Sequence, residues 1–454
     1  MRWLAWVDDP SGVSRAGTGP APAATTGPAR RDPRPVSASP GAPAGDSPAV
    51  DRRSLATAQR SLGDPEIRYP LLPPLVSGCP RTSTDAMSYP VEVTYDYARV
   101  PDGFLTARPA GPGPALDRWS ALLPPLAAPG LGEGGTPLID IGDGVYVKDE
   151  SRNPTWSHKD RLNRCTVSAA VAAGAPGVVV ASSGNHGASA AAYAARAGLR
   201  CVVLTSAGLP PAMASFVTAY GAVVLPVPVA DRWPLTRWIA DAYGFHPVSN
   251  LTPFHTGHAY GPEGYKTVAY EIAADLGMPA AVFLPTGYGE LLFGVWKGFS
   301  ELHRLGLLPG VPRLFSCEPA AGGPLAAALR SGRPGARVEV GPTDAYGISC
   351  PVGGYRGVVA VRRSEGRALT VSDEDMRRAR DELARRGLWV ELSAAAGLAG
   401  LRTLPGPDGF EGPVVCVTTS SGFKDTATGG ESPAPADPSR EAVRERLRSA
   451  GIRS

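Results

Sequence analysis

Lys159 is the side chain whose position is most suggestive of covalent chemistry. It follows an Asn153-Pro154-Thr155 turn and lies in the first turn of an expected helix, where Ser157 and Asp160 have the spacing of a capping box. A lysine amine held near a helix N-terminus can form a Schiff base with a bound carbonyl compound. By itself, a solvent-exposed lysine is the commoner arrangement at such a position. The assignment therefore depends on the segments that accompany Lys159.

Polar turns that could hold anionic groups follow several expected strands. The segment SSGNHG (182–187) and the turn Gly287-Tyr288-Gly289-Glu290 each lie between a strand and a helix, where backbone amides can bind an anion. The segment VTTSSGFKD (417–425) follows an apolar strand and offers several hydroxyl groups. Each segment taken alone could equally be an ordinary polar connection.

Together with NPTWSHKDR (153–161) and LGEGGTPL (131–138), these segments resemble a known enzyme family. The similarity is to the threonine synthase branch of the fold type II enzymes that use pyridoxal 5′-phosphate (PLP), a superfamily that includes the tryptophan synthase β-subunit. It extends from about Leu131 to Asp425. The resemblance implies a lyase that eliminates or replaces a β or γ substituent of a small amino acid, with PLP held as a Schiff base on Lys159.

The resemblance also implies a role for each matching residue. The cofactor would contact His158, Asn185 at the ring hydroxyl, Gly287, Tyr288, Gly289 and Glu290 at the phosphate, and Thr419 or its neighbour Ser420 at the pyridine nitrogen. The substrate would contact Ser182, Ser183, His186 and His255. Because a hydroxyl keeps the ring nitrogen protonated less strongly than an aspartate does, the ring would favour elimination over transamination.

Two departures from the family pattern bear on the substrate. The family usually has Gly-Ser-Phe before the lysine, whereas this chain has Trp156-Ser157-His158, which is more similar to the tryptophan synthase β-subunit. His255 stands at the apparent place of an arginine that holds the phosphate of phosphohomoserine in threonine synthases. Three hypotheses remain: a threonine synthase-like lyase, a dehydratase or β-replacement enzyme with an unphosphorylated substrate, and a PLP-binding protein without turnover.

The elements that must position these residues alternate along the chain. From about Val145, β-branched runs such as VVVAS (178–182) and AVFLPT (281–286) alternate with alanine-rich helical patterns. The pattern predicts an α/β fold, and the resemblance implies two doubly wound parallel-sheet domains with PLP in the cleft between them. Residues 87–175 and 255–430 would form the large PLP-binding domain, and residues 176–254 a smaller mobile domain. Residues 431–454 would be a C-terminal tail.

Residues 1–86 are rich in proline, alanine and glycine and have no periodic apolar pattern, so they are predicted to be a disordered tail. Strand-like alternation begins just after Met87, which suggests Met87 as a more natural start of the functional protein. That interpretation places all catalytic elements after residue 86.

Composition narrows the class of protein. The 454 residues carry 45 basic and 42 acidic side chains, and this balance gives no reason to expect nucleic acid as a partner. The apolar runs are too short for a membrane span, so we expect a cytoplasmic protein. The six cysteines form no C-x-x-C pair, and His255 and His258 lack neighbouring ligands, so neither disulfides nor a metal are expected. The resemblance further implies a homodimer.

Overall fold

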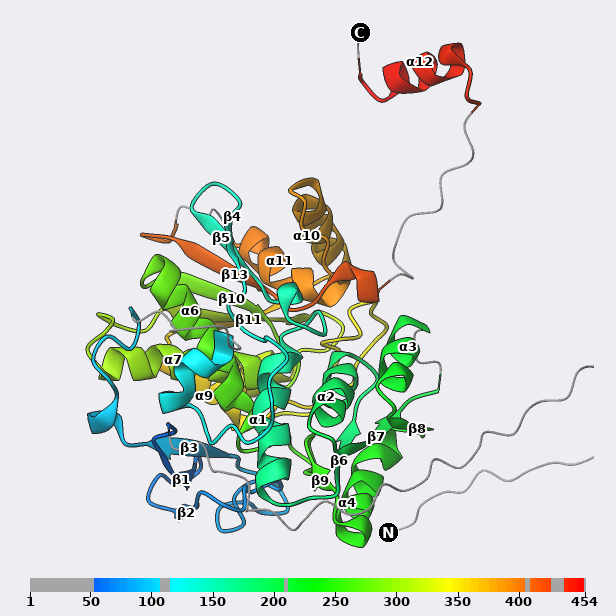
Figure 1. Cartoon of the computed structure of the whole chain (residues 1–454). Helices are drawn as coiled ribbons and strands as arrows, with labels where there is room; N and C mark the ends of the chain where they lie inside the picture. Colours follow the sequence, from blue (N-terminus) through cyan, green and yellow to red (C-terminus); the bar gives the residue numbers. More distant parts are fainter. Residues whose placement is uncertain (1–52, 107–114, 208–210, 405–408, 426–436, 453–454) are drawn as a thin grey trace, which may run out of the picture. The chain divides into compact units, whose positions relative to one another are not determined.

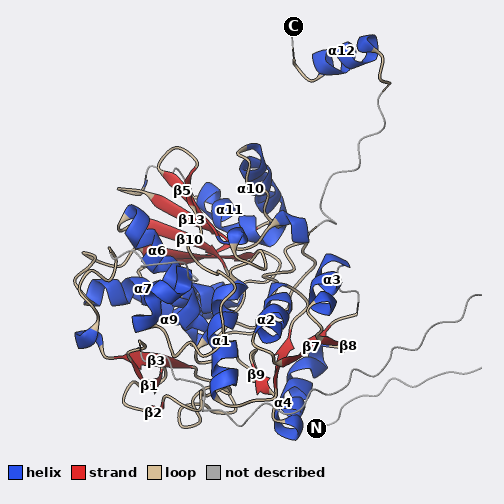
Figure 2. Cartoon of the chain, viewed as in Figure 1, coloured by secondary structure: helices blue, strands red, loops and turns tan. Residues whose placement is uncertain are grey.

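The computed structural model describes residues 53–106, 115–207, 211–404, 409–425 and 437–452 (Figure 1). These residues form a six-stranded, a four-stranded and a three-stranded sheet, and helices surround the two larger sheets (Figure 2). Within the described ranges, none of the helices has the length and apolar character that a membrane span requires.

The six-stranded sheet has the order β12-β11-β10-β13-β5-β4. All neighbouring strands are parallel except β4, which is antiparallel to β5. Its strands are β4 (Leu138–Asp140), β5 (Val145–Asp149), β10 (Ala281–Pro285), β11 (Arg313–Pro319), β12 (Arg367–Val371) and β13 (Val414–Thr418). The central strands β10 and β13 are buried along their whole length, as expected for parallel strands that are covered on both faces.

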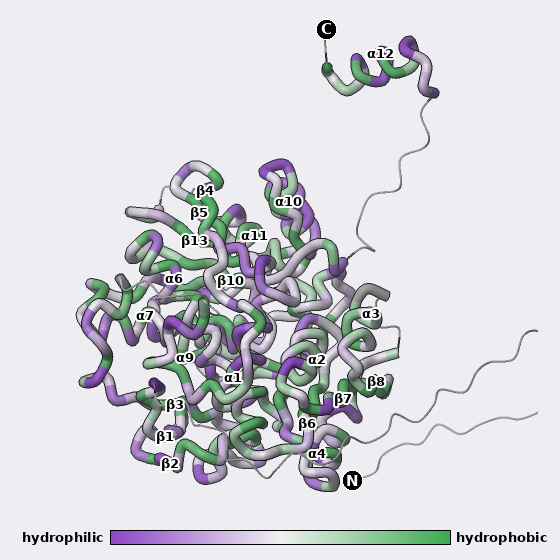
Figure 3. The backbone as a smooth tube through the Cα atoms, viewed as in Figure 1, coloured by the Kyte–Doolittle hydropathy of each residue, from purple (hydrophilic) through white to green (hydrophobic). Residues whose placement is uncertain are grey.

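Alternating residues of these strands enter two separate hydrophobic cores. Val282 and Val415 belong to the core shared with α1, α6, α7 and α9, whereas Phe283 and Cys416 belong to the core shared with α10 and α11. The pattern of the central strands thus places helices on both faces of the sheet. In contrast to these apolar strands, helix α10 consists mostly of hydrophilic residues (Figure 3).

The four-stranded sheet has the order β8-β7-β6-β9 and is entirely parallel. Its strands are β6 (Gly177–Ala181), β7 (Arg200–Thr205), β8 (Val223–Pro226) and β9 (His246–Pro247). Two of its helices, α2 and α3, share one core with the sheet, and α4 packs in another. The strands lie within the segment 176–254, and the mobility of that segment stays a prediction.

The helices follow the alternation that the sequence indicates. They are α1 (Lys159–Ala172), α2 (Asn185–Arg196), α3 (Pro211–Ala219), α4 (Arg232–Tyr243), α5 (Gly261–Tyr265), α6 (Thr267–Leu276), α7 (Glu290–Arg304), α8 (Pro324–Arg330), α9 (Tyr355–Arg363), α10 (Asp373–Arg385), α11 (Ala396–Thr403) and α12 (Arg440–Ser449). The last of these, α12, lies in the segment predicted to be a C-terminal tail.

The N-terminal prediction was wrong for residues 53–86, while residues 1–52 lie outside the described residues. Strand β1 (Ala56–Ser61) is the middle strand of the sheet β2-β1-β3, between β2 (Arg68–Pro70) and β3 (Val91–Tyr95). Its buried Gln59 donates to three backbone carbonyl oxygens. The sequence ATAQRS gave no sign of a strand because polar side chains that are satisfied by tertiary hydrogen bonds take the buried positions. Met87 is therefore not a natural start of the folded protein.

Candidate active site

A cavity of about 270 Å³ brings together all the predicted site residues except Ser420. Its walls include the segments that follow β6, β10 and β13, and the first residue of α1. In parallel sheets, the carboxyl ends of the strands are where ligands bind. The predicted site residues that line it are His158, Lys159, Ser182, Ser183, Asn185, His186, His255, Gly287, Tyr288, Gly289, Glu290 and Thr419.

Lys159 is the first residue of α1, and its amine faces the cavity. The Nζ atom donates a hydrogen bond of 3.0 Å to the hydroxyl of Tyr265. Burial lowers the pKa of Lys159, and the nearby carboxylates of Glu290 and Glu391 oppose that shift only in part. A lowered pKa increases the fraction of neutral amine, which is the form that attacks a carbonyl group or accepts a proton.

The start of α1 is fixed differently from the capping box that the sequence suggests. The carboxylate of Asp160 accepts hydrogen bonds from the amide of Thr155 at 2.6 Å, from its hydroxyl at 2.5 Å, and from Ser189 of α2 at 2.6 Å. Ser157 makes no capping bond, and its buried hydroxyl has no hydrogen-bond partner in the described part of the chain. The position of Lys159 is thus tied to the preceding turn and to α2.

His158 connects the start of α1 to the segment after β13. Its backbone amide donates to the carbonyl oxygen of Thr419 at 3.0 Å, and its Nδ1 lies 3.1 Å from the same oxygen. The imidazole also stacks on the ring of Tyr265 with 5.2 Å between ring centroids. Burial lowers the pKa of His158 well below its ordinary value, so the ring is neutral.

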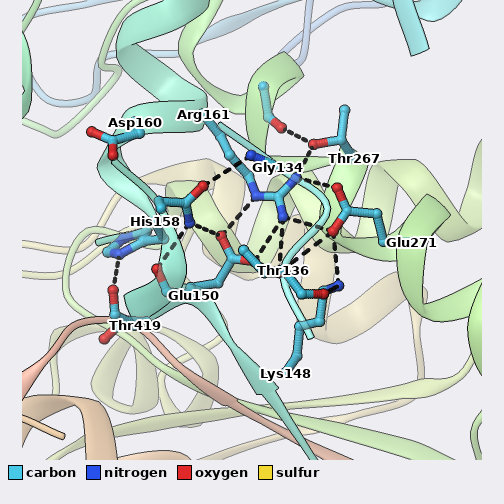
Figure 4. A network of polar contacts seen from close by, with 12 residues as sticks. Gly134, Thr136, Lys148, Glu150, His158, Asp160, Arg161, Thr267, Glu271 and Thr419 are labelled. Atoms are coloured by element: carbon cyan, nitrogen blue, oxygen red, sulfur yellow. Dashed lines mark hydrogen bonds and ion pairs between the residues drawn. The ribbon is translucent and has the colours of Figure 1, made fainter. Parts of the chain in front are cut away.

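A buried ionic network centred on Arg161 also fixes the start of α1 (Figure 4). The guanidinium of Arg161 donates to both oxygens of Glu150 at 2.7 and 2.8 Å and to both oxygens of Glu271 at 2.7 and 2.8 Å. Lys148 of β5 lies 2.7 Å from Glu271. Each charge in this network has an opposite charge and several hydrogen bonds, which is the condition for burying charges without a large cost. The network joins α1, β5 and α6 directly behind Lys159.

The turn between β10 and α7, residues 287–290, forms a cradle that could bind an anion through its backbone amides. The amides of Gly287, Tyr288, Gly289 and Glu290 make no hydrogen bond to the residues that the structure describes. A Cβ atom on Gly287 would lie 2.9 Å from the sulfur of Cys350, and Gly289 has a φ of +85°. Free amides at the start of a 15-residue helix, in a turn that excludes side chains, suit a terminal phosphate.

The carboxylate of Glu290 lies against this cradle and is balanced by an arginine. Arg356 Nη1 is 3.4 Å from Glu290 Oε1, and burial raises the pKa of Glu290. The side chain also fills the space beside Gly257, because a Cβ on that glycine would lie 2.0 Å from the same oxygen. The family resemblance assigned Glu290 to the cradle through its amide, and the structure adds a carboxylate that reaches away toward Arg356.

The amide side chain of Asn185 is fully engaged. Its nitrogen donates to both carboxylate oxygens of Glu391 at 3.2 Å, and its oxygen accepts from Lys424 at 2.8 Å and from Ser420 at 3.3 Å. Ser420 donates also to the carbonyl oxygen of Trp156, and it does not line the cavity. The hydroxyl of Thr419 has no partner among the described residues, which favours Thr419 over Ser420 as the group available to a ligand.

The histidines of the cavity carry no charge at neutral pH. Burial lowers the pKa of His186 to about 3 and that of His255 well below its ordinary value. His255 stacks on Tyr288 with ring centroids 4.1 Å apart, and Tyr288 contacts Trp233 of α4 on the opposite sheet. His258 pairs instead with His246, Nε2 to Nε2, at 2.9 Å. His255 therefore does not replace the charge of an arginine.

Several cavity residues escaped the sequence analysis. They include Arg232, Trp233, Tyr346, Cys350 and Glu391. Tyr265, which does not line the cavity but contacts Lys159, was missed as well. None of the five cavity residues lies in a motif that the family resemblance covers closely. Arg232 is the first residue of α4 and Glu391 precedes a short 3-10 helix, and neither belongs to a recognisable motif, so neither position stands out in the sequence. Tyr265 alone had a signal, because its segment, Glu263-Gly264-Tyr265-Lys266-Thr267, fits the family pattern.

The functional groups of the site are an amine, backbone amides and hydroxyls. Among the residues that the structure describes, no group of three His, Cys, Asp or Glu side chains is arranged to hold a metal. All six cysteines are free and buried. A buried amine, a phosphate-sized amide cradle and an available hydroxyl remain as the functional groups.

Comparison with known proteins agrees with this geometry. The family model described as "Pyridoxal-phosphate dependent enzyme" matches residues 130–421. The threonine synthase of Methanosarcina acetivorans is 33% identical over 381 residues, covering 79% of this chain and 92% of that protein. The threonine synthase of Mycobacterium tuberculosis is 37% identical over 347 residues, covering 72% of this chain and 91% of that protein.

Solved structures agree on the fold. Maize serine racemase superposes with a TM-score of 0.54 at 17% identity and covers 69% of this chain and 92% of its own. The threonine deaminase isoform 2 of Solanum lycopersicum gives a TM-score of 0.52 at 18% identity, with 68% and 79% covered. At these identities the likeness establishes the architecture alone, which is the fold type II arrangement expected from the sequence. The chain belongs to the pyridoxal-phosphate dependent enzymes and, within them, to the lyases of the threonine synthase type.

Proposed function

We propose that this chain is a threonine synthase, which releases phosphate from phosphohomoserine and adds water to give threonine. The observation that carries the proposal is the single cavity in which Lys159, the cradle 287–290 and Thr419 meet. The curated relatives that match most of the chain are named threonine synthases, which supports the same reaction.

The cavity residues fit the cofactor of this family. The amides of 287–290 would hold the phosphate, and the two glycines leave the space that a Cβ would fill. The hydroxyl of Thr419 would face the ring nitrogen, and Asn185 would contact the ring hydroxyl by exchanging part of its bond to Glu391. Lys159 would bind the cofactor covalently as a Schiff base. PLP, when bound, supplies an electron sink for charge that develops at the substrate Cα.

Lys159 is also the proposed base. Its pKa is lowered by burial, so the amine can accept the proton of the substrate Cα once it is free. The hydroxyl of Tyr265, which burial keeps protonated by raising its pKa, lies 3.0 Å from the amine and holds it in place. The loop 182–187 would hold the substrate carboxylate at the start of α2, with Ser182, Ser183 and His186 beside it.

The proposal also covers the localisation, oligomeric state and partners of the protein. We infer a cytoplasmic homodimer that binds a small amino acid and neither nucleic acid nor membrane. The near balance of 45 basic and 42 acidic residues supports the absence of nucleic acid from its partners. Residues 176–254 would move over the cavity to exclude water during the reaction.

One observation favours a second candidate. His255, at the apparent place of the family's phosphate-binding arginine, is neutral and stacked on Tyr288. A neutral ring binds a phosphate dianion less well than a guanidinium, which favours a dehydratase or β-replacement enzyme with an unphosphorylated substrate. Phosphohomoserine, phosphoserine, serine and threonine should be tested as substrates. Phosphate release from phosphohomoserine alone supports the threonine synthase, whereas ammonia and an oxoacid from serine or threonine support the second candidate.

Replacement of Lys159 tests the assignment of the catalytic amine. The substitutions Lys159→Ala and Lys159→Arg should each reduce kcat by at least about 10³-fold, because both remove the primary amine that bonds to the cofactor. Both should also abolish the visible absorption of the lysine-bound cofactor. Lys159→Arg keeps the positive charge and serves as the control for simple charge loss. A variant that kept turnover and absorption would contradict the proposal, as would a wild-type protein that bound PLP but turned over none of the four amino acids.

A further inference from the structure

Arg232 is a cavity residue to which neither the family pattern nor the reaction assigns a role. Of the lysine and arginine side chains within the described ranges, only Lys159 and Arg232 line the cavity. Arg232 Nη2 donates to the hydroxyl of Ser183 at 2.9 Å, while its buried Nε has no hydrogen-bond partner in the described part of the chain. No carboxylate of the described residues lies within ion-pair distance of its guanidinium. An arginine of this kind has capacity to bind an anion.

The position of Arg232 is costly for the protein without a ligand. It is the first residue of α4, where the positive end of the helix dipole disfavours a cation. Burial also lowers the pKa of Arg232, which means that the charged form has lost part of its hydration. Positions that violate local rules without internal compensation are concentrated at functional sites.

Hydroxyl groups surround the guanidinium on one side. Ser183 Oγ lies 2.8 Å from Ser206 Oγ and 3.2 Å from Thr205 Oγ1, and the amide of Ser206 donates to it at 3.1 Å. Ser183 follows β6, Thr205 is the last residue of β7, Ser206 follows it, and α4 comes after β8. The ends of three parallel strands therefore bring the guanidinium and this hydroxyl cluster together, and the cluster reaches the cavity through Ser183. A guanidinium with hydroxyl donors is a common arrangement for binding phosphate oxygens.

We propose that Arg232 binds a second anionic group of the substrate, a phosphate carried by its side chain. The inference rests on the proposed function, and it names the residue that takes over from the absent arginine at position 255.

Binding measurements on the PLP-loaded enzyme test this inference without relying on turnover. Isothermal titration with inorganic phosphate, phosphoserine and serine gives three dissociation constants for each variant. Arg232→Gln should weaken phosphate and phosphoserine by at least about tenfold and change serine by less than about twofold, because only the charge-assisted bonds to phosphate are lost. Arg232→Lys should restore part of the affinity, since lysine keeps the charge but not the paired donors.

Arg237→Gln is the matched control, because Arg237 lies on the same helix and donates outside the cavity, to Ser77 and to the carbonyl oxygen of Leu251. It should bind all three ligands as the wild type does. Equal weakening of serine and phosphoserine in Arg232→Gln would place Arg232 at the α-carboxylate and overturn the inference. Wild-type enzyme that bound neither phosphate nor phosphoserine would also overturn it.

The same variants separate this inference from the proposed function. If Arg232→Gln loses affinity for phosphate while wild-type enzyme fails to convert phosphohomoserine, the phosphate site stands and the threonine synthase assignment falls. If wild-type enzyme converts phosphohomoserine and Arg232→Gln does so with an unchanged KM, the assignment stands and the inference falls. Circular dichroism and the visible absorption of the cofactor establish that each variant is folded and loaded.

Discussion

Asp160, the residue next to Lys159, illustrates how a single side chain is held in a state that favours the site. Its carboxylate is buried, and burial raises its pKa from 3.8 to about 6 although three hydrogen bonds favour the charged form. At neutral pH the group is ionised and accepts from Thr155 and Ser189. The residue thus connects the turn before Lys159 to α2 at the expense of some stability of the fold.

This shift predicts a pH dependence of stability. Between about pH 4 and pH 6 the folded chain retains a proton on Asp160 that the unfolded chain has released, so raising the pH through that window lowers the free energy of unfolding. A pKa difference of this size corresponds to about 3 kcal/mol. The buried histidines, whose pKa values are lowered, act in the opposite direction but contribute equally to both proteins, so urea unfolding of the wild type and of Asp160→Asn should be compared at several pH values. The stability of the wild type relative to Asp160→Asn should fall as the pH rises through this window. An identical pH profile in both proteins would contradict the shift.

At the scale of elements, the turn between β10 and α7 depends on a backbone conformation that excludes side chains. Gly289 has a φ of +85°, and a Cβ there would lie 3.0 Å from the Cα of Gly357 in α9. Most residues with a side chain avoid this conformation, and the close approach to α9 leaves no room to adjust. The turn can therefore present its amides only if glycine is kept at 289.

Gly289→Ala should accordingly weaken PLP binding by at least about tenfold, because the strained turn would re-aim its amides. Gly277→Ala is the matched control: Gly277 has a φ of +83°, but a Cβ there meets no atom within 4 Å, and the residue does not line the cavity. Both variants should lose about 1–2 kcal/mol of stability from backbone strain. Equal affinity for PLP in the two variants, measured by fluorescence titration, would show that the turn is not the phosphate site.

The elements differ in how far the sequence predicts them. Apolar runs such as those of β10 and β13 predict parallel strands because burial on both faces leaves a continuous pattern. Motifs at strand ends predict the cavity, since the ends of parallel strands converge. Arg232 and Glu391 could not be predicted as cavity residues, because their places in the cavity depend on the tertiary structure and not on a local sequence pattern. Strand β1 was missed for the same reason, because its buried Gln59 is satisfied by hydrogen bonds to residues 70–75, which come later in the chain.

For the whole molecule, residues 53–86 are bound to the rest of the fold. Lys297 of α7 donates to the carbonyl oxygen of Val93 at 2.5 Å, and Arg356 of α9 donates to that of Val91 at 2.7 Å, so β3 is fixed to the helices around the cavity. Strand β1 covers the other edge of β3. The three-stranded sheet is thus part of the support of the large sheet's helices.

A chain that begins at Met87 should therefore be recovered mainly as aggregate. It lacks β1 and β2, which leaves the edge of β3 unpaired and open to intermolecular pairing. A chain that begins at Arg53 keeps the whole three-stranded sheet and is the control, expected to remain soluble. The soluble fraction and the thermal unfolding midpoint measure the difference. Equal solubility and activity of the two chains would show that residues 53–86 are dispensable.

The pairing of β5 with β13 has a consequence for the synthesis of the chain. Thr418 of β13 contacts Asp149 of β5 across 269 residues of sequence. At a translation rate of about 5 to 20 residues per second, the edge of β5 that pairs with β13 waits roughly 13 to 54 s for its partner strand. The start of α1, which depends on the carbonyl oxygen of Thr419, waits equally long. The active site is thus assembled only when nearly the whole chain has emerged, and a nascent-chain chaperone would meet its exposed strands first.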